Sequence, residues 1–200
     1  MEKEFMDFKA RGMFFAEVRK NGKVIETIEK HNLIVNTSCH VIARLLAGAV
    51  AQGGDEIFSK QISKIGIGAF ATDPAGGYSQ FVSSVDKTTL DGDTPLFYKN
   101  FIKVSGGSVS PNTDGGGTSN IIYNESNSPN DVTYQFYIGT SECNVVGGSN
   151  NIWEFGLFTQ DDIMFSMLTR LDLGKDYPIV KDETVDISGY WKIQVRNTSV

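Results

Sequence analysis

Two histidines and two cysteines are the residues of this 200-residue chain that could supply the nitrogen and sulfur ligands of a metal site. His31, Cys39, His40 and Cys143 reach the count of a four-ligand zinc site, but they lack paired C-x₂-C or H-x₃-H spacing. Cys39 and His40 are adjacent near an expected helix start, where neighbouring side chains diverge by about 100°. We therefore expect no metal site. A Cys39–Cys143 disulfide requires that the fold bring the two residues together, and we expect free, buried thiols instead.

Acidic residues offer two further kinds of chemistry. Asp91-Gly92-Asp93, with Asp86 nearby, carries oxygens that could bind calcium, but it lacks the spaced acceptors and the terminal Glu of an EF-hand loop. The pairs Asp161/Asp162 and Asp182/Glu183 fall in predicted turns, where a solvated charge is the ordinary state. We expect plain turns at all three places.

Glu154 differs because it lies inside an otherwise apolar strand, between Trp153 and Phe155. It could act as an acid with a raised pKa. The favoured interpretation is a strand residue that faces water or pairs with Lys or Arg.

Glycines 66 and 68 begin the stretch Gly66 to Ala71, which matches the relaxed G-x-G-x-x-A pattern of dinucleotide-binding loops. That chemistry needs a helix to start there, but Thr72 to Gly77 would break one. A turn is the better interpretation. The chain also has no G-x-S-x-G nucleophile elbow. We therefore expect no catalytic residue, cofactor or small-molecule substrate, and hence no enzyme.

The charge and the hydropathy of the chain argue against two classes of partner. The chain has 18 basic and 24 acidic residues, a net charge of −6, which argues against a nucleic-acid partner. The start of the chain lacks the basic and apolar regions of a secretory signal. The longest apolar stretch, Val41 to Ala51, is interrupted by Arg44 and Gly48 and is too short to span a bilayer. We expect synthesis in the cytoplasm and no membrane partner.

The elements that position these residues are mostly strands. Asn21-Gly22 between two alternating runs predicts a β-hairpin over residues 12–30, and a second hairpin joins 152–158 to 163–168. Further strands are expected at 32–35, 64–68, 97–104, 132–138 and 190–195. Apolar residues at four-residue spacing predict one amphipathic helix at about 38–51.

Together these elements predict a mainly β fold: an antiparallel β-sandwich with one amphipathic α-helix and long Gly-rich loops, forming a single domain over residues 1–200. Residues 105–119 are expected to form a long exposed loop, and residues 1–11 an extended N-terminal arm. We regard this loop and this arm as candidate contact segments. Most of the 22 aromatic residues lie on alternating strand positions, which favours core filling over a carbohydrate-binding platform.

Several segments, taken in order, resemble a family of tailed-bacteriophage virion proteins that occur as tail, neck or baseplate components and at the N-termini of some tail fibres. The resembling segments are Asn32 to Asn36, the helix from Val41 to Ala49, Ile65 to Gly68, Ile152 to Phe158, Ile163 to Ser166, Lys175, Asp186 to Ser188 and Tyr190 to Ile193. Similar fibre-type modules carry an E-x-G-L-F/Y strand, a hairpin, a Lys and a closing W-x-I strand in that order.

The resemblance implies a non-enzymatic structural component of a virion, with other copies of itself and other virion proteins as partners. It implies no catalytic residue. After the Trp191 strand only a few residues follow, with no repetitive shaft, so we expect a stand-alone module in the tail, neck or baseplate. The alternative is a module that binds host-surface carbohydrate or attaches a fibre.

Overall fold

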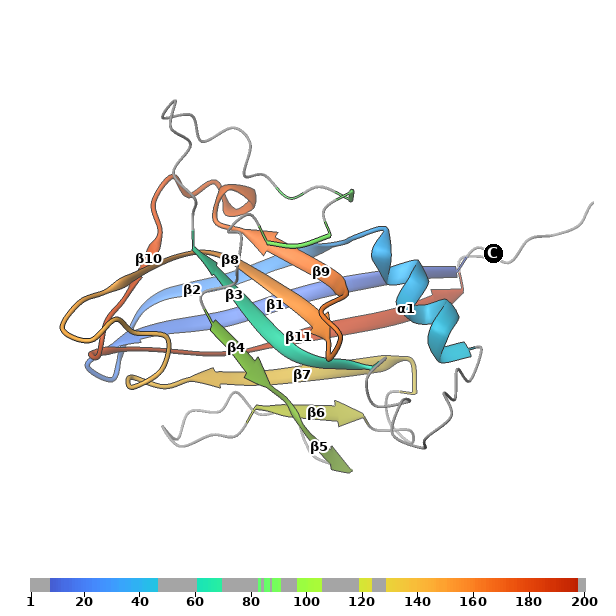
Figure 1. Cartoon of the computed structure of the whole chain (residues 1–200), viewed down its shortest axis with the longest axis horizontal. Coiled ribbons are helices and arrows are strands. Elements are labelled where there is room, and N and C mark those ends of the chain that lie inside the picture. Colours follow the sequence, from blue (N-terminus) through green and yellow to red (C-terminus); the bar gives the residue numbers. More distant parts are fainter. Residues whose placement is uncertain are drawn as a thin grey trace, which may run out of the picture.

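The computed structural model describes residues 8–46, 61–69, 83, 85–86, 88–90, 97–105, 119–123 and 129–197. These residues form strands for the most part, with one α-helix and one short 3-10 helix (Figure 1). The strands are β1 (Phe8–Lys20), β2 (Lys23–Ile34), β3 (Ile62–Ala69), β4 (Phe97–Asn100), β5 (Ile102–Ser105), β6 (Asn120–Tyr123), β7 (Asp131–Ile138), β8 (Asn150–Thr159), β9 (Met164–Thr169), β10 (Ile179–Lys181) and β11 (Val185–Asn197). The helices are α1 (Thr37–Leu46) and η1 (Leu171–Leu173).

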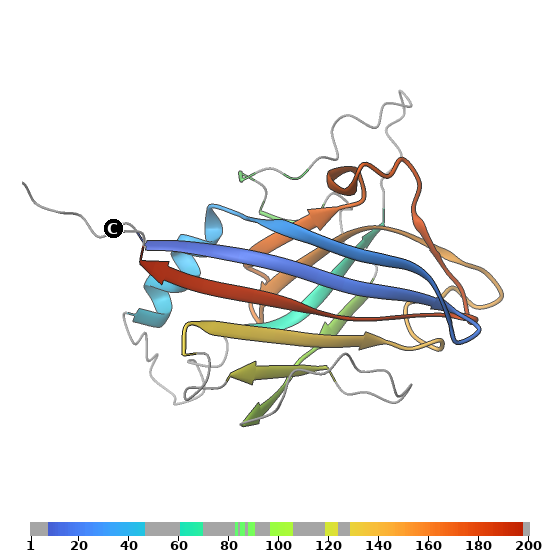
Figure 2. The ribbon, with the colours of Figure 1, turned by 180° about the vertical axis from the view of Figure 1, so that it is seen from behind.

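The strands form one curled sheet in the order β4-β3-β8-β9-β2-β1-β11-β7-β6-β5, with β10 paired to β8 outside that path. Figure 2 shows the face made by β2, β1, β11 and β7 from behind. Every strand pair in the described part of the chain is antiparallel except β5 with β6. The predicted mainly β, antiparallel fold with a single helix is therefore confirmed for these residues.

Phe101 lies between β4 and β5, the two strands at the opposite ends of the sheet. It separates β4, which pairs with β3, from β5, which pairs with β6 on the opposite face. Its amide donates to the carbonyl of Ser63 at 2.7 Å, and its ring packs 5.4 Å from that of Tyr134. The prediction of a single strand at 97–104 is thus wrong in one respect. The chain kinks at Phe101, so the residues before it pair at one edge of the sheet and the residues after it pair at the other edge.

The β1–β2 hairpin closes as its sequence predicts. Asn21 and Gly22 both have positive φ, 52° and 75°, which is the backbone of a type I′ turn. The hairpin is longer than predicted, since the expected strand at 32–35 continues β2. Residues 8–11 also belong to β1, where Phe8 pairs with Asn197, so the extended arm predicted for 1–11 is wrong from Phe8 onward. Residues 1–7 lie outside the described part.

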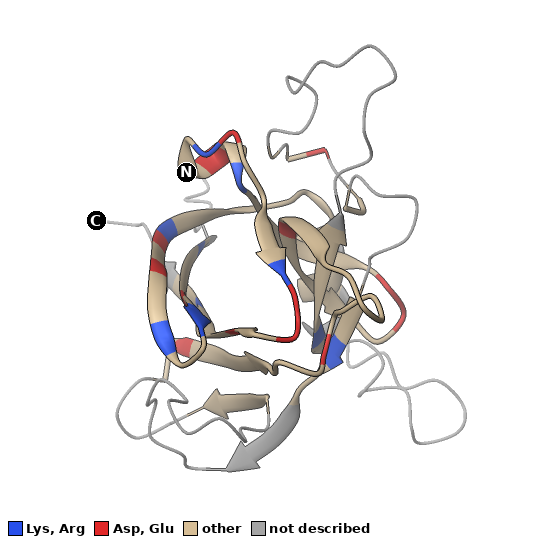
Figure 3. Cartoon of the chain, turned by 90° about the vertical axis from the view of Figure 1, so that its left-hand side faces the viewer, with Lys and Arg blue, Asp and Glu red and all other residues tan. Residues whose placement is uncertain are grey.

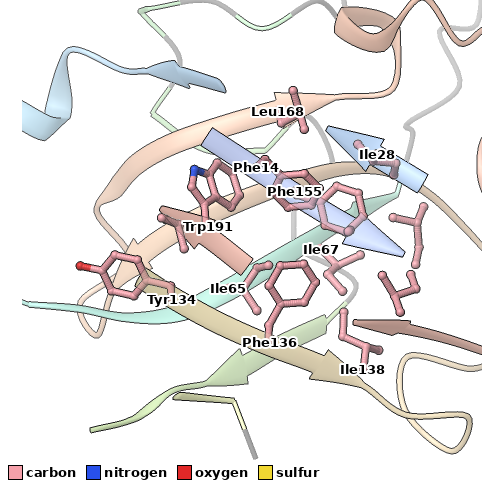
Figure 4. Close-up of a cluster of buried hydrophobic side chains, with 14 of the residues drawn as sticks. Phe14, Ile28, Ile65, Ile67, Tyr134, Phe136, Ile138, Phe155, Leu168 and Trp191 are labelled. Atoms are coloured by element: carbon pink, nitrogen blue, oxygen red, sulfur yellow. The ribbon is translucent and has the colours of Figure 1, made fainter. Parts of the chain in front are cut away.

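The core lies inside the curl, where alternate residues of facing strands meet (Figure 4). The Phe14 ring lies 5.0 Å from Trp191, 5.1 Å from Phe155 and 5.6 Å from Phe136, measured between ring centroids. All four side chains are buried. This packing agrees with the prediction that the aromatic residues of the strands fill the core.

A second, smaller apolar cluster covers the outer face of β8 and β9. It consists of Val35, Leu90, Phe158, Met164 and Met167, all buried. Leu90 comes from the segment around residues 83–90, which is held to the start of α1 by the Asn36 amide donating to the Val85 carbonyl at 2.8 Å. The helix itself is described from residue 37 to 46, and the predicted extension to residue 51 lies outside the described residues.

The central pair β1–β11 approaches closely at Gly189, which lies opposite Ala16. A Cβ atom at position 189 would lie 2.1 Å from the Phe15 carbonyl oxygen and 2.8 Å from the Ala16 Cα. Both neighbours are backbone atoms of a central strand, so they cannot move aside without disturbing the register. Only glycine fits there.

We expect Gly189→Ala to lower the free energy of unfolding by about 3 kcal/mol or more, because overpacking against backbone cannot relax. Gly148→Ala is the matched control, since its Cβ would meet only Val145, at an ordinary 3.6 Å, and should cost about 0.5 kcal/mol or less. Urea unfolding followed by circular dichroism measures both. Equal midpoints for the two variants would contradict the close approach at Gly189.

Buried tyrosines make stability depend on alkaline pH. Burial raises the pKa of Tyr134 far above its ordinary value of 10.0, and burial together with Asp162 raises that of Tyr98 to about 12. Above pH 10 the unfolded chain loses these protons while the folded chain keeps them, so stability falls with a slope of up to ~1.4 kcal/mol per pH unit for each tyrosine. Below pH 10 both states are protonated and this dependence disappears.

Tyr134→Phe should therefore give a flatter fall in the urea midpoint above pH 10 than the unchanged chain. The comparison at each pH cancels the titration of lysines. Tyr177→Phe, at a half-exposed position, serves as control and should keep the original slope. The same slope in Tyr134→Phe and in the unchanged chain would rule this account out.

Candidate functional site

The glycine pattern at Gly66 is part of a strand. Gly66 and Gly68 lie inside β3, and Gly66 pairs with Gly156 of β8. A Cβ at Gly66 would lie 2.6 Å from the Phe158 ring, so the glycines make room for packed side chains. The strand predicted at 64–68 is confirmed, and residues 70–77 lie outside the described part of the chain. Within residues 61–69 no helix follows that could bind a pyrophosphate.

Three of the four possible zinc ligands, His31, Cys39 and Cys143, have side chains that the structure describes, and they are not grouped. The side chain of His40 lies outside the described part. His31 is exposed on β2, Cys39 is exposed on α1, and Cys143 is buried in the β7–β8 loop. In the part of the chain that the structure describes, no three His, Cys, Asp or Glu residues are grouped as a metal site. Both cysteines are free, as predicted, but the expectation that both are buried is wrong for Cys39.

Glu154 is 1% exposed, so of its two predicted alternatives, facing water or pairing with Lys or Arg, the first is wrong. It lies opposite Gly68 in the β3–β8 register, and a Cβ at that glycine would lie 2.5 Å from its Oε2. The glycine therefore provides the space that the carboxylate occupies.

The paired acids cap turns, as predicted. Asp161 accepts a hydrogen bond from the Thr159 hydroxyl at 2.5 Å, and Asp162 forms an ion pair with Lys64 at 2.7 Å. The hydroxyl and amide of Thr184 both donate to Asp182 and lower the pKa of its carboxyl. Asp86 accepts from Asn36 at 2.9 Å. Residues 91–93 and 106–118 lie outside the described residues.

The structure directs attention instead to one end of the sheet, which we name the loop end. It comprises the β1–β2 turn (21–22), the β7–β8 loop (139–149) and the β10–β11 turn (182–184), which lie together in Figures 1 and 2. The Asn21 amide donates to the Thr184 carbonyl at 2.8 Å, and Lys20 forms an ion pair with Asp182 at 3.7 Å. Figure 3 views this end, with acidic and basic residues interspersed around it.

Lys181 holds the β7–β8 loop to β10. Its ammonium group is fully buried and donates to the Asn144 Oδ1 at 2.7 Å, to the Asp182 carbonyl at 3.0 Å and to the Thr140 carbonyl at 3.4 Å. All three acceptors are neutral oxygens. Burial lowers the pKa of Lys181, because the charged form loses its hydration.

Arg170 is the second fully buried cation near this end. Its guanidinium donates to both carboxylate oxygens of Glu26, at 2.7 and 3.1 Å, and to the Tyr177 carbonyl at 3.2 Å. This fork–fork geometry joins the end of β9 to β2. It fixes the β1–β2 hairpin relative to the opposite face of the sheet.

A hollow of about 740 Å³ opens between the β7–β8 loop and the β10–β11 turn. Apolar side chains also project into solvent around the loop end: Val24, Ile25, Val145, Val146 and Val180, all at least half exposed. A rigid group of loops with exposed aliphatic tips is suited to contact another protein surface.

Sequence reasoning missed Lys181 and Arg170. One signal for Lys181 was available, because Ile179 and Lys181 share one strand face and Val180 lies on the other, exposed face. For Arg170 no local pattern points to Glu26, which is 144 positions away.

A comparison of this chain with protein-family models, curated proteins and solved structures finds no match in any of the three. Among the described residues, no helix has the length and apolar character needed to cross a membrane.

Removing Glu26 should destabilise the fold strongly, because Arg170 would become an uncompensated buried cation. We expect Glu26→Ala to cost about 3–5 kcal/mol in urea unfolding, and Glu29→Ala, at an exposed site on the same strand, about 0.5 kcal/mol or less. The double variant Glu26→Ala/Arg170→Met should be more stable than Glu26→Ala alone. A double variant that is less stable would contradict this assignment.

Proposed function

We propose that this chain is a non-enzymatic structural component of a tailed-phage virion, which forms homo-oligomeric contacts in the tail, the neck or the baseplate. The observation that carries the proposal is the loop end: three loops fastened to one another, with Val24, Ile25, Val145, Val146 and Val180 projecting from them. The class of assembly is inferred from sequence, because the segments around Ile65 and Trp191 resemble those of phage virion proteins.

The physical requirements of such a component agree with this geometry. A part of a symmetric assembly repeats the same contact many times, so a small rigid surface can act through multiplicity. Lys181 fixes the β7–β8 loop to β10, and Arg170 fixes β2 to the end of β9, which keeps the ordering cost of binding low. The exposed valines and Ile25 supply the apolar area.

A carbohydrate-binding role is the alternative. Aromatic platforms bind sugars through exposed ring faces, but the rings of Phe14, Phe136, Phe155 and Trp191 are in the core. The exposed Tyr177 has the cations of Arg170 and Lys175 about 5 Å from its ring. The described aromatic residues therefore favour assembly over sugar binding.

Light scattering after size exclusion tests the assembly role. We expect the unchanged chain to form an oligomer of defined mass, alone or with virion proteins from the same genome. Ile25→Asp and Val146→Asp should reduce this association at least tenfold, because each places a charge in the contact. Val85→Asp is the matched control, since Val85 is also exposed but lies away from the loop end.

Gradient-purified particles from cells that carry the gene should contain peptides of this chain, and deletion of the gene should yield incomplete particles by electron microscopy. A strict monomer that binds no virion protein would contradict the proposal. So would complete, infectious particles without the chain. Glycan-array binding that is lost on Tyr177→Ala would support the carbohydrate alternative instead.

A further inference from the structure

The side-chain amine of Lys181 lies next to the side-chain carboxamide of Asn144, and solvent does not reach the lysine. The Lys181 side chain is 0% exposed, and its Nζ lies 2.7 Å from the Asn144 Oδ1. Asn144 is half-buried, and its Nδ2 donates to the Thr140 carbonyl, which fixes the plane of the amide. The amine and the carboxamide are therefore held next to each other in the folded chain, which raises their effective concentration.

The surroundings of the amine favour its uncharged form. No carboxylate of the described residues lies within ion-pair distance of Nζ, and its acceptors are two backbone carbonyls and one amide oxygen. Burial lowers the pKa of Lys181, while the nearby Cys143, Asp182, Asp186 and Glu142 act in the opposite direction. A free amine is the nucleophilic form of lysine.

We propose that Lys181 and Asn144 condense to an intramolecular isopeptide bond, which joins β10 covalently to the β7–β8 loop. A bond forms between the Lys181 Nζ and the Asn144 Cγ, and the bond from that Cγ to Nδ2 breaks. The lysine ammonium gives up two protons, and the departing nitrogen leaves as ammonium with four hydrogens. Charge and atoms balance, and the step needs no oxidant, reductant or activated co-reactant.

The bond would make the loop end more resistant to force and to denaturant. The hydrogen bonds of Lys181 are the described side-chain contacts from β10 to the β7–β8 loop, and the hollow lies between that loop and the following turn. A covalent link would keep the exposed Val145 and Val146 in place under force or denaturant. The proposal is independent of the phage assignment, because it depends only on side chains of this chain.

Intact-mass spectrometry of the purified full chain, unfolded after incubation at about pH 9, tests the bond. We expect a mass below that of the sequence by one ammonia, about 17 Da, and one joined peptide that contains residues 144 and 181 after proteolysis. Lys181→Met and Asn144→Ala should both restore the full mass. Asn151→Ala, at an exposed asparagine of β8, is the matched control and should keep the loss.

Asn144→Asp gives a second, independent test by mass. Condensation of the lysine with a carboxylic acid would release water, about 18 Da, in place of ammonia. The unchanged chain itself decides the question if a variant fails to fold. A folded, unchanged chain that keeps its full mass after prolonged incubation, with no joined peptide, overturns the proposal. In that case Lys181 is a non-covalent clamp only.

Discussion

The packing of Phe14 against Trp191, Phe136 and Phe155 is the interaction on which the curled sheet depends. It joins β1, its neighbour β11 and the next strand, β7, to β8 on the opposite face. Large rings can fill the curl only if the central strands approach closely, and Gly189 permits that approach. The same rule applies on the outer face, where Gly66 and Gly156 leave room for Phe158. The large aromatic rings therefore pack in the sheet only because glycines leave space beside them.

Charged groups have a different role in this molecule. Two basic side chains, Arg170 and Lys181, are fully buried, and each connects segments that belong to different parts of the sheet. A buried hydrogen-bond donor is costly to leave without acceptors, so each side chain specifies the position of the groups around it. This is how loops without regular structure can hold exposed apolar side chains in fixed places.

Local patterns predicted what local physics decides. Asn21-Gly22 predicted the first hairpin, the polar turn at 159–162 predicted the β8–β9 hairpin, and alternation placed β7 and the core face of β11. The kink at Phe101 was not predictable, because it follows from which strands lie on either side of the finished sheet. The burial of Glu154 was not predictable for the same reason: it depends on the absent side chain of Gly68 on another strand. The loop end escaped sequence analysis because its fastening contacts join residues tens of positions apart.

The register of β1 with β11 has a consequence for how the chain folds. Thirteen consecutive residues of β1 pair with β11, from Phe8 with Asn197 to Lys20 with Val185. The ribosome makes β11 more than a hundred residues after β1, so one edge of the nascent β1–β2 hairpin has no partner during most of synthesis. Such distant pairing slows folding and leaves a strand edge open to other chains. Polysomes that carry several growing copies are therefore the place where this protein is most exposed to misassembly.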